Sequence, residues 1–321
     1  MTATSSQPTV FLFSGQGSQF FQMARTLNEQ VPAFSRRMRR MDELVADTTG
    51  RSVLATLYGD QQHPMPFNDL SITHPAIFMV EFALAQALIE AGVIPTHTLG
   101  ASLGSAAAAA VSGCLTMEVA LDLVVQHARI VQARCEPGAM VAVLSDPSAC
   151  SQSVLKHEAE IAALNFDGHF VVSTPARHLA GLEASLRLQS LSFQILPVPI
   201  AFHSSWIDPA QQEIHSDADA RPCARAHTPL MCCATTRLLA SLPRDFFWRV
   251  MREPIRLRPA VQAMEALGPC RYIDVGPSGT MATFLKYILP PSSRSTTRAI
   301  ISPYHRDLVA FNDITATYAT A

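Results

Sequence analysis

The sequence has little charge and no long apolar run, and both absences narrow its function. Only 16% of its 321 residues are charged, and the formal net charge is −2. A chain so close to neutral gives no reason to expect nucleic acid as a partner. It has no run of about 18 apolar residues, which a membrane-spanning helix requires. Near the amino terminus, the apolar stretch of four residues follows no basic segment. We therefore expect a cytoplasmic protein with no signal peptide and no membrane partner.

Cysteine is sparse and irregularly spaced. The chain has seven cysteines, an odd number, and Cys232 and Cys233 are the one adjacent pair. The Cys-x-x-Cys spacing that is typical of zinc sites and redox-active thiols does not occur. We therefore expect a reduced protein without a metal ion.

The chain is long enough to bury a sizeable core, and 48% of its residues are hydrophobic. An apolar stretch over 9–13 predicts a buried strand that ends in a glycine-rich turn, and 95–100 predicts another strand. The alanine run from Ser105 onward favours a helix. Three more segments predict helices: 20–48, 73–92 and 117–135. This alternation of strands and helices predicts an α/β core.

The pattern changes near residue 138. From there to residue 198 the predicted order is βαββαβ, with its first helix over 148–159, and this order is typical of a ferredoxin-like α+β fold. Beyond that segment the earlier pattern resumes. We therefore expect a large domain of residues 1–137 and 199–321, interrupted by a small subdomain of residues 138–198.

The stretch GASLG places Ser102 between two glycines, after a predicted strand and before a predicted helix. In a nucleophile elbow the glycines permit a tight turn that exposes the serine hydroxyl. The following helix then offers backbone N–H groups to an oxyanion. Small residues also occur wherever a strand meets a closely packed helix, so the motif alone leaves both interpretations open.

A serine nucleophile needs a base, and His203 follows a strand-like stretch in AFHSSWIDP. Histidines in such places are often hydrogen-bonded core residues, so His203 taken alone also has two interpretations.

Five segments in order resemble the malonyl-CoA:acyl-carrier-protein transacylase family, which includes the acyltransferases of polyketide synthases. They are FSGQGSQ (13–19), GASLG (100–104), AFHSSWIDP (201–209), MREPIRL (251–257) and YIDVGPSGTM (272–281). The resemblance covers nearly the whole chain. It implies an α/β-hydrolase-like large domain with a parallel sheet, and a ferredoxin-like small subdomain.

The resemblance also implies a ping-pong mechanism, with Ser102 as nucleophile and His203 as general base. The oxyanion hole and the carbonyl that orients the histidine would come from the main chain at three positions: Gln16, Leu103 and Glu253. Asp208 is a rival orienting residue, although its position also fits a turn or a helix cap. The substrate would be an acyl phosphopantetheine thioester, with no metal or other cofactor.

The sequence departs from the family in its predicted acyl pocket. Members that use malonyl carry an arginine on the helix after the elbow, which binds the free carboxylate in a bidentate pair. Aligning that helix on residues 123–132 places His127 there, and a neutral imidazole cannot replace a guanidinium. An alignment shifted by two residues would restore Arg129. Ala101 and His74 replace the usual histidine and glutamine, so several pocket positions differ.

Phe202 also belongs to the predicted acyl pocket and is typical of narrow pockets for small acyl groups. In lacking the arginine, the sequence resembles the trans-acting acyl hydrolases of trans-acyltransferase polyketide synthases. These remove acyl groups from stalled carrier proteins and transfer them to water. We therefore predict a hydrolase (thioesterase) for acetyl and other non-malonyl acyl groups. Two alternatives stay open: a transferase that loads acetyl or malonyl from coenzyme A, and a non-catalytic docking partner.

The predicted partners are acyl carrier protein domains of a polyketide synthase, which are acidic and favour a basic docking surface. Arginines cluster in residues 35–40 and again in residues 248–258. Charge runs of this kind also occur on solvated helix faces. We expect a monomer that acts in trans.

Overall fold

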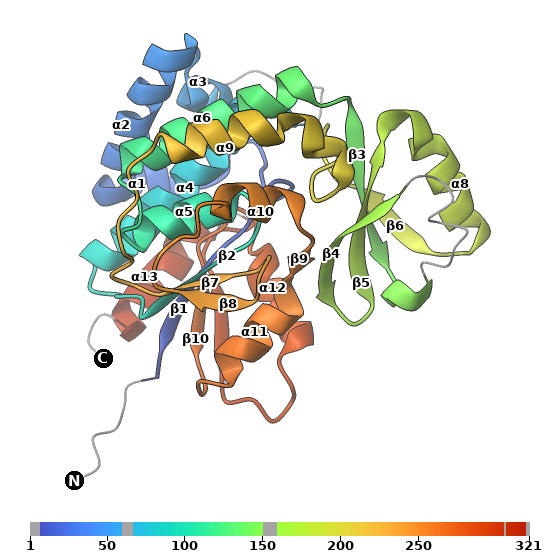
Figure 1. The fold of residues 1–321 in the computed structure, drawn as a ribbon. Helices are drawn as coiled ribbons and strands as arrows, with labels where there is room; N and C mark the ends of the chain where they lie inside the picture. Colours follow the sequence, from blue (N-terminus) through green and yellow to red (C-terminus); the bar gives the residue numbers. More distant parts are fainter. Residues whose placement is uncertain (1–6, 60–66, 150–158, 305, 319–321) are drawn as a thin grey trace.

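The computed structural model describes residues 7–59, 67–149, 159–304 and 306–318. It has two lobes, each built on its own sheet (Figure 1). The strands of the larger sheet are β1 (Thr9–Phe13), β2 (His97–Gly100), β7 (Leu230–Cys232), β8 (Arg237–Leu239), β10 (Arg271–Asp274) and β11 (Thr296–Ala299). Their order is β11-β10-β1-β2-β7-β8. All neighbours are parallel except β7 and β8, which are antiparallel. The prediction of a mixed α/β fold with a parallel sheet is confirmed.

Both faces of the larger sheet are buried, as a parallel sheet requires. On β1, Phe11 and Phe13 belong to the hydrophobic cluster that holds most of the helices, while Val10 and Leu12 pack on the opposite face. The helices of the first face are α1 (Arg25–Gln30), α2 (Pro32–Thr49), α3 (Val53–Tyr58), α4 (Leu70–Glu90), α5 (Gly104–Val111), α6 (Met117–Arg134), α10 (Phe246–Arg252) and α13 (Asp307–Tyr318). The opposite face is covered by α11 (Leu257–Glu265) and α12 (Thr280–Ile288). A further helix, α9 (Gln211–Asp219), packs against α6 and α10.

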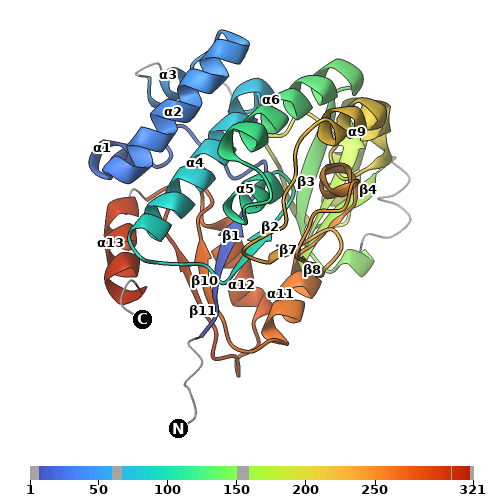
Figure 2. The ribbon, with the colours of Figure 1, turned by 60° about the vertical axis from the view of Figure 1, so that its left-hand side comes forward.

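The helix expected over 20–48 is two helices, α1 and α2. Val31 between them is extended, and Pro32 takes the first turn of α2, where its missing N–H costs nothing. Figure 2 shows α4 between α2 and α6. By length and composition α4 could cross a membrane, but 89% of its most apolar window is buried inside the protein. It is the central helix of the core.

The small lobe has a sheet of order β6-β3-β5-β4-β9. Its strands are β3 (Gly138–Leu144), β4 (Glu160–Phe166), β5 (His169–Pro175), β6 (Ser192–Ile195) and β9 (Ile255–Arg256). The first four are antiparallel neighbours in the ferredoxin-like order, with α8 (Leu179–Leu188) over one face. Short 3-10 helices occupy Pro147–Ala149, Ala176–His178 and Ser205–Ala210. Most of the helix predicted over 148–159 lies outside the described residues.

One strand of the small sheet comes from the far side of the predicted domain boundary. β9 pairs in parallel with β4, although β9 lies about sixty residues beyond the predicted end of the subdomain at residue 198. The two lobes are therefore joined through this edge of the small sheet, and β9 begins two residues after Glu253. The division into a large domain of residues 1–137 and 199–321 and a small subdomain of residues 138–198 stays a prediction.

Candidate active site

Ser102 lies in a sharp turn between β2 and α5. Its φ is 53°, in the left-handed region that non-glycine residues rarely adopt. Glycine is required at both flanking positions because other backbone atoms lie too close for a Cβ. A Cβ added to Gly100 would lie 2.6 Å from the Cα of Ser105, and one added to Gly104 would lie 2.2 Å from the carbonyl oxygen of Ser14. This is the geometry of a nucleophile elbow.

The hydroxyl of Ser102 meets the imidazole of His203. Its Oγ lies 2.8 Å from Nε2, and the other ring nitrogen, Nδ1, lies 2.8 Å from the backbone carbonyl oxygen of Glu253. A carbonyl only accepts hydrogen bonds, so Nδ1 carries the ring proton and is the donor of this hydrogen bond. Nε2 is then the acceptor for the serine hydroxyl.

Several contacts hold His203 in place. Its backbone N–H donates to the carbonyl of Met251 at 2.9 Å, and its φ of 60° is also left-handed.

Asp208 does not contact the imidazole. Its Oδ1 accepts from Nε of Arg252 at 2.5 Å. Of the two orienting residues considered from the sequence, the structure places Glu253 at the ring.

Burial keeps the His203 imidazole neutral. It lowers the pKa to about 4, although the hydrogen bond to the Glu253 carbonyl raises it in part. At neutral pH the ring can therefore accept a proton from Ser102.

Two backbone amides are free to bind an oxyanion beside the serine. Those of Gln16 and Leu103 have no acceptor among the described residues. The glycine-rich loop after β1 passes close to the elbow: a Cβ added to Gly15 would lie 3.0 Å from the Cβ of Ser102 and 3.6 Å from the backbone nitrogen of Leu103. The structure thus places the loop that carries the Gln16 amide beside Ser102 and Leu103.

A buried carboxyl group on α4 holds the start of that loop. Glu81 Oε1 accepts from the backbone N–H of Ser14 at 2.6 Å and from its hydroxyl at 2.9 Å. Burial raises the pKa of Glu81 well above its usual value, and nearby Asp274 raises it further. Burial thus favours the protonated form of this carboxyl group, although the hydrogen bonds from Ser14 favour the charged form. We did not identify this residue from the sequence, although a lone acid in the apolar stretch FMVEFALA is a detectable signal.

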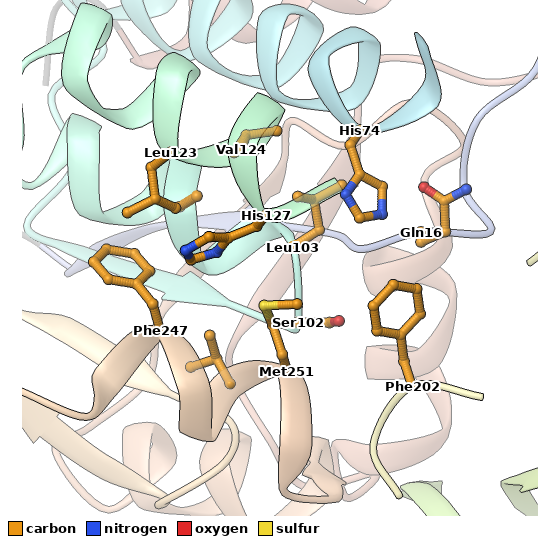
Figure 3. Close-up of a pocket in the computed structure, with 12 residues that line it drawn as sticks. Gln16, His74, Ser102, Leu103, Leu123, Val124, His127, Phe202, Phe247 and Met251 are labelled. Atoms are coloured by element: carbon orange, nitrogen blue, oxygen red, sulfur yellow. The ribbon is translucent and has the colours of Figure 1, made fainter. Parts of the chain in front are cut away.

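A pocket opens from Ser102 into the large lobe (Figure 3). It encloses about 460 Å³, its open mouth included. Most of its lining is apolar, and none of the described residues that line it is lysine or arginine. The lining residues are Gln16, His74, Ser102, Leu103, Ala106, Leu123, Val124, His127, Phe202, Phe247, Val250 and Met251.

The pocket decides between the two alignments of α6. His127 points into it, as expected (Figure 3). Arg129 lies elsewhere, and its Nη2 donates to the backbone carbonyl of Thr48 at 2.9 Å. The shifted alignment, which would place Arg129 in the pocket, is wrong because that side chain lies on another face of the helix.

Behind His127 lies a carboxylate that the sequence did not reveal. The Oδ2 of Asp217, on α9, is 3.4 Å from Nε2 of His127. Asp217 pairs with Arg221 at 2.7 Å, and Arg221 pairs with Asp122 at 2.7 Å. Burial lowers the pKa of His127, although Asp217 raises it in part. The imidazole is thus neutral, beside a network of two carboxylates and one guanidinium.

His74 enters the same pocket from α4 (Figure 3). Only 4% of the residue is exposed, and neither ring nitrogen has a partner among the described residues. Burial lowers its pKa to about 3, with a smaller contribution from His127. Its ring centre lies 5.7 Å from that of Phe202.

A wider cleft of about 1210 Å³ reaches Ser102 from the junction of the lobes. It shares Gln16, Ser102 and Phe202 with the pocket. Ala101, which we expected in the pocket, lines this cleft instead, because neighbours of the elbow serine point to opposite sides. The opposite wall comes from the small lobe and includes a buried pair, Asn165 and His169, whose side-chain nitrogens are 3.1 Å apart. Ser102 therefore stands where a narrow apolar pocket meets a broad cleft.

The two arginine clusters are largely paired within the chain. Those on α2 and around α10 form these ion pairs: Arg36 and Arg37 with Glu90, Arg40 with Glu43, Arg249 with Glu253, Arg252 with Asp208, and Arg258 with Asp167. This favours solvated faces over a dedicated docking surface. Among the described residues no group of three or more histidine, cysteine, aspartate or glutamate side chains could hold a metal ion.

Comparison with known proteins shows the family of this chain. A model of the acyl transferase domain family matches residues 10–321. The polyketide biosynthesis acyltransferase homolog BaeD of Bacillus velezensis is 41% identical over 304 residues, which cover 94% of this chain and 94% of BaeD. PksD of Bacillus subtilis, which carries the same description, is 36% identical over 310 residues, or 96% of each chain.

Solved structures share the fold at lower identity. A loading acyltransferase from the avermectin modular polyketide synthase superposes with a TM-score of 0.87 at 24% identity, over 96% of this chain and 99% of that one. FabD from Acinetobacter baumannii gives a TM-score of 0.82 at 20% identity, over 98% and 99%.

Proposed function

This chain belongs to the acyl transferase domain family, and we propose that it serves polyketide biosynthesis as an acyl hydrolase. In this proposal it removes acetyl and other non-malonyl acyl groups from acyl carrier proteins. The observation that carries the proposal is the neutral acyl pocket. The two histidines that line it, His74 and His127, are uncharged at neutral pH. None of its described lining residues is lysine or arginine.

A free carboxylate would be costly in this pocket. A buried anion needs a cation or several donors to replace its hydration. The nearest charged network contributes two carboxylates and one guanidinium, and Arg221 is already paired with both Asp217 and Asp122. Malonyl would meet no free cation, whereas acetyl and other neutral groups lose little on entering an apolar pocket.

The geometry supports a two-step acyl transfer. Ser102 Oγ attacks the thioester carbonyl while Nε2 of His203 takes its proton, and the amides of Gln16 and Leu103 stabilise the oxyanion. The C–S bond breaks, and the thiol leaves with the proton from His203. The product is an ester of Ser102. No metal or redox cofactor is needed, because the histidine supplies all proton transfers.

In the second step water replaces the thiol. The water oxygen attacks the ester carbonyl while His203 takes a proton from the water. The ester C–O bond breaks, and the proton returns to Ser102 Oγ. The broad cleft would hold the phosphopantetheine arm in the first step and admit water once the arm has left.

Intact-protein mass spectrometry tests the proposal. Carrier proteins loaded with acetyl, butyryl or malonyl are incubated with the enzyme, with Ser102→Ala as the matched control. We expect acetyl and butyryl to be lost to water, malonyl to be retained, and Ser102→Ala to be inactive.

Adding holo carrier protein and coenzyme A as competing acceptors separates the alternatives. Transfer of acetyl or malonyl to either acceptor, without loss to water, would establish a transferase and overturn the hydrolase. No acyl loss from any substrate, with Ser102→Ala indistinguishable from wild type, would favour a docking partner.

A further inference from the structure

The acyl pocket contains buried polar atoms that the proposed mechanism does not use. Both ring nitrogens of His74 and Oε1 of Gln16 have no hydrogen-bond partner among the described residues, whereas Nε2 of His127 lies 3.4 Å from Oδ2 of Asp217. All three residues line the one pocket, which they enter from α4, from α6 and from the loop after β1 (Figure 3).

Such atoms are unusual in a folded protein. Most buried polar side-chain atoms have a partner, and those that do not need an explanation. His74 is 4% exposed, so bulk water does not serve its nitrogens. Gln16 Nε2 does find a partner, Thr73 Oγ1 at 2.9 Å, and in this orientation of the amide Oε1 is an acceptor at the pocket. The rest of the lining is apolar, so the polar atoms form a small cluster in an otherwise hydrophobic site.

The chemistry of this cluster specifies its ligand. A neutral imidazole offers one N–H donor and one lone-pair acceptor, and Gln16 Oε1 adds a second acceptor. A methyl or alkyl group satisfies neither kind. A ketone or a carboxylate only accepts, so it would leave the acceptors unpaired. A hydroxyl group both donates and accepts, so it can pair with the imidazole N–H and with one of the two acceptors.

We propose that this pocket selects short acyl chains that carry a hydroxyl group over unsubstituted chains of the same length. His74 would be the main specificity-determining residue, with His127 and Gln16 beside it. This inference rests on the proposed function, because it names the acyl groups that the enzyme removes.

The test compares 3-hydroxybutyryl carrier protein, as each enantiomer, with butyryl carrier protein. We expect kcat/KM for one 3-hydroxybutyryl enantiomer to exceed that for butyryl by about tenfold or more, which corresponds to about 1.4 kcal/mol. His74→Leu should reduce this ratio to near one, and His74→Gln, which restores a donor and an acceptor, should recover part of it. The ratio is the readout because a misfolded variant would lose both activities together.

Two outcomes overturn the inference. One is a wild-type ratio of one or less for both enantiomers, as expected if ordered water satisfies the cluster. The other is a high ratio that survives in both His74→Leu and His127→Leu. Either result leaves the hydrolase intact if butyryl is still lost to water. Transfer of the acyl group to holo carrier protein would instead overturn the hydrolase while the ratio could still be measured.

Discussion

The imidazole of His127 lies 3.4 Å from the carboxylate of Asp217, at the inner end of the acyl pocket. Burial keeps the ring neutral although an acid lies beside it, because desolvation lowers its pKa more than Asp217 raises it. The pocket therefore has an uncharged wall with a carboxylate directly behind it. A carboxylate that entered the pocket would meet this second carboxylate behind the ring, which disfavours it beyond the loss of an arginine.

His127→Arg should raise malonyl hydrolysis, and Asp217 should limit the gain. The new guanidinium would reach the pocket, but Asp217 would compete with malonyl for its N–H groups. We expect a modest increase in malonyl turnover for His127→Arg and a larger one for His127→Arg with Asp217→Asn. The measurement is kcat/KM with malonyl carrier protein, and Arg129→Ala is the control that should change nothing. Unchanged malonyl turnover in both His127 variants would contradict this account of the pocket.

His203→Ala should lower turnover of acetyl carrier protein by about 10³-fold or more, because Ser102 loses its base. Asp208→Asn should stay within about twofold of wild type, since it breaks only a partly exposed ion pair with Arg252. Steady-state assays on both variants, with circular dichroism to check folding, make the comparison. A large loss for Asp208→Asn would return that residue to the site.

The activity should extend to acid pH. His203 must be neutral to accept a proton, and burial lowers its pKa to about 4. We expect kcat/KM to be constant from neutral pH down to about 5 and to be halved near pH 4, in a profile recorded on protein shown to be folded at each pH. An acid limb centred near the ordinary histidine value of about 6.5 would show that the site is more solvated than its burial indicates.

The fold was predictable because many of its signals are local, whereas Ser102 and His203 were linked only through the order of five segments along nearly the whole chain. The spacing of glycines around Ser102 and the order of strands and helices depend on short segments, and both agree with the structure. The short strands β8 and β9 were not predictable, since two or three residues carry no usable periodicity. Asp217 was missed because it reaches His127 only when α9 packs on α6, about ninety residues away along the chain.

Glu81 should be replaceable by glutamine but not by leucine. The buried carboxyl, whose pKa burial raises, accepts two hydrogen bonds from Ser14, which the amide oxygen of glutamine can also accept. Leucine would leave the backbone N–H of Ser14 unpaired, at a cost of about 1–3 kcal/mol, while the Ser14 hydroxyl could still donate to Ser18 Oγ at 3.0 Å. We expect Glu81→Leu to lower the free energy of unfolding, measured in urea, and to reduce kcat more than KM by loosening the loop that carries the Gln16 amide. Equal stability of Glu81→Leu and Glu81→Gln would show that this contact does not hold the loop.

His74 should make the folded protein sensitive to acid. Its pKa is about 6.5 in the unfolded chain and about 3 in the folded one, because burial disfavours the imidazolium. Between these values the unfolded state binds more protons, so the free energy of unfolding falls as the pH falls through this window. Lowering the pH from about 7 to about 5 should cost wild type about 2 kcal/mol more than His74→Gln. Burial raises the pKa of Asp274 to about 6, so protonation of Asp274 increases the free energy of unfolding as the pH falls. This effect is the same in wild type and in His74→Gln, and it therefore cancels in the comparison. The check is urea unfolding of both proteins at both pH values. Parallel losses would mean that His74 is hydrated in solution, and a hydrated His74 would also remove the reason for its preference for a hydroxyl group.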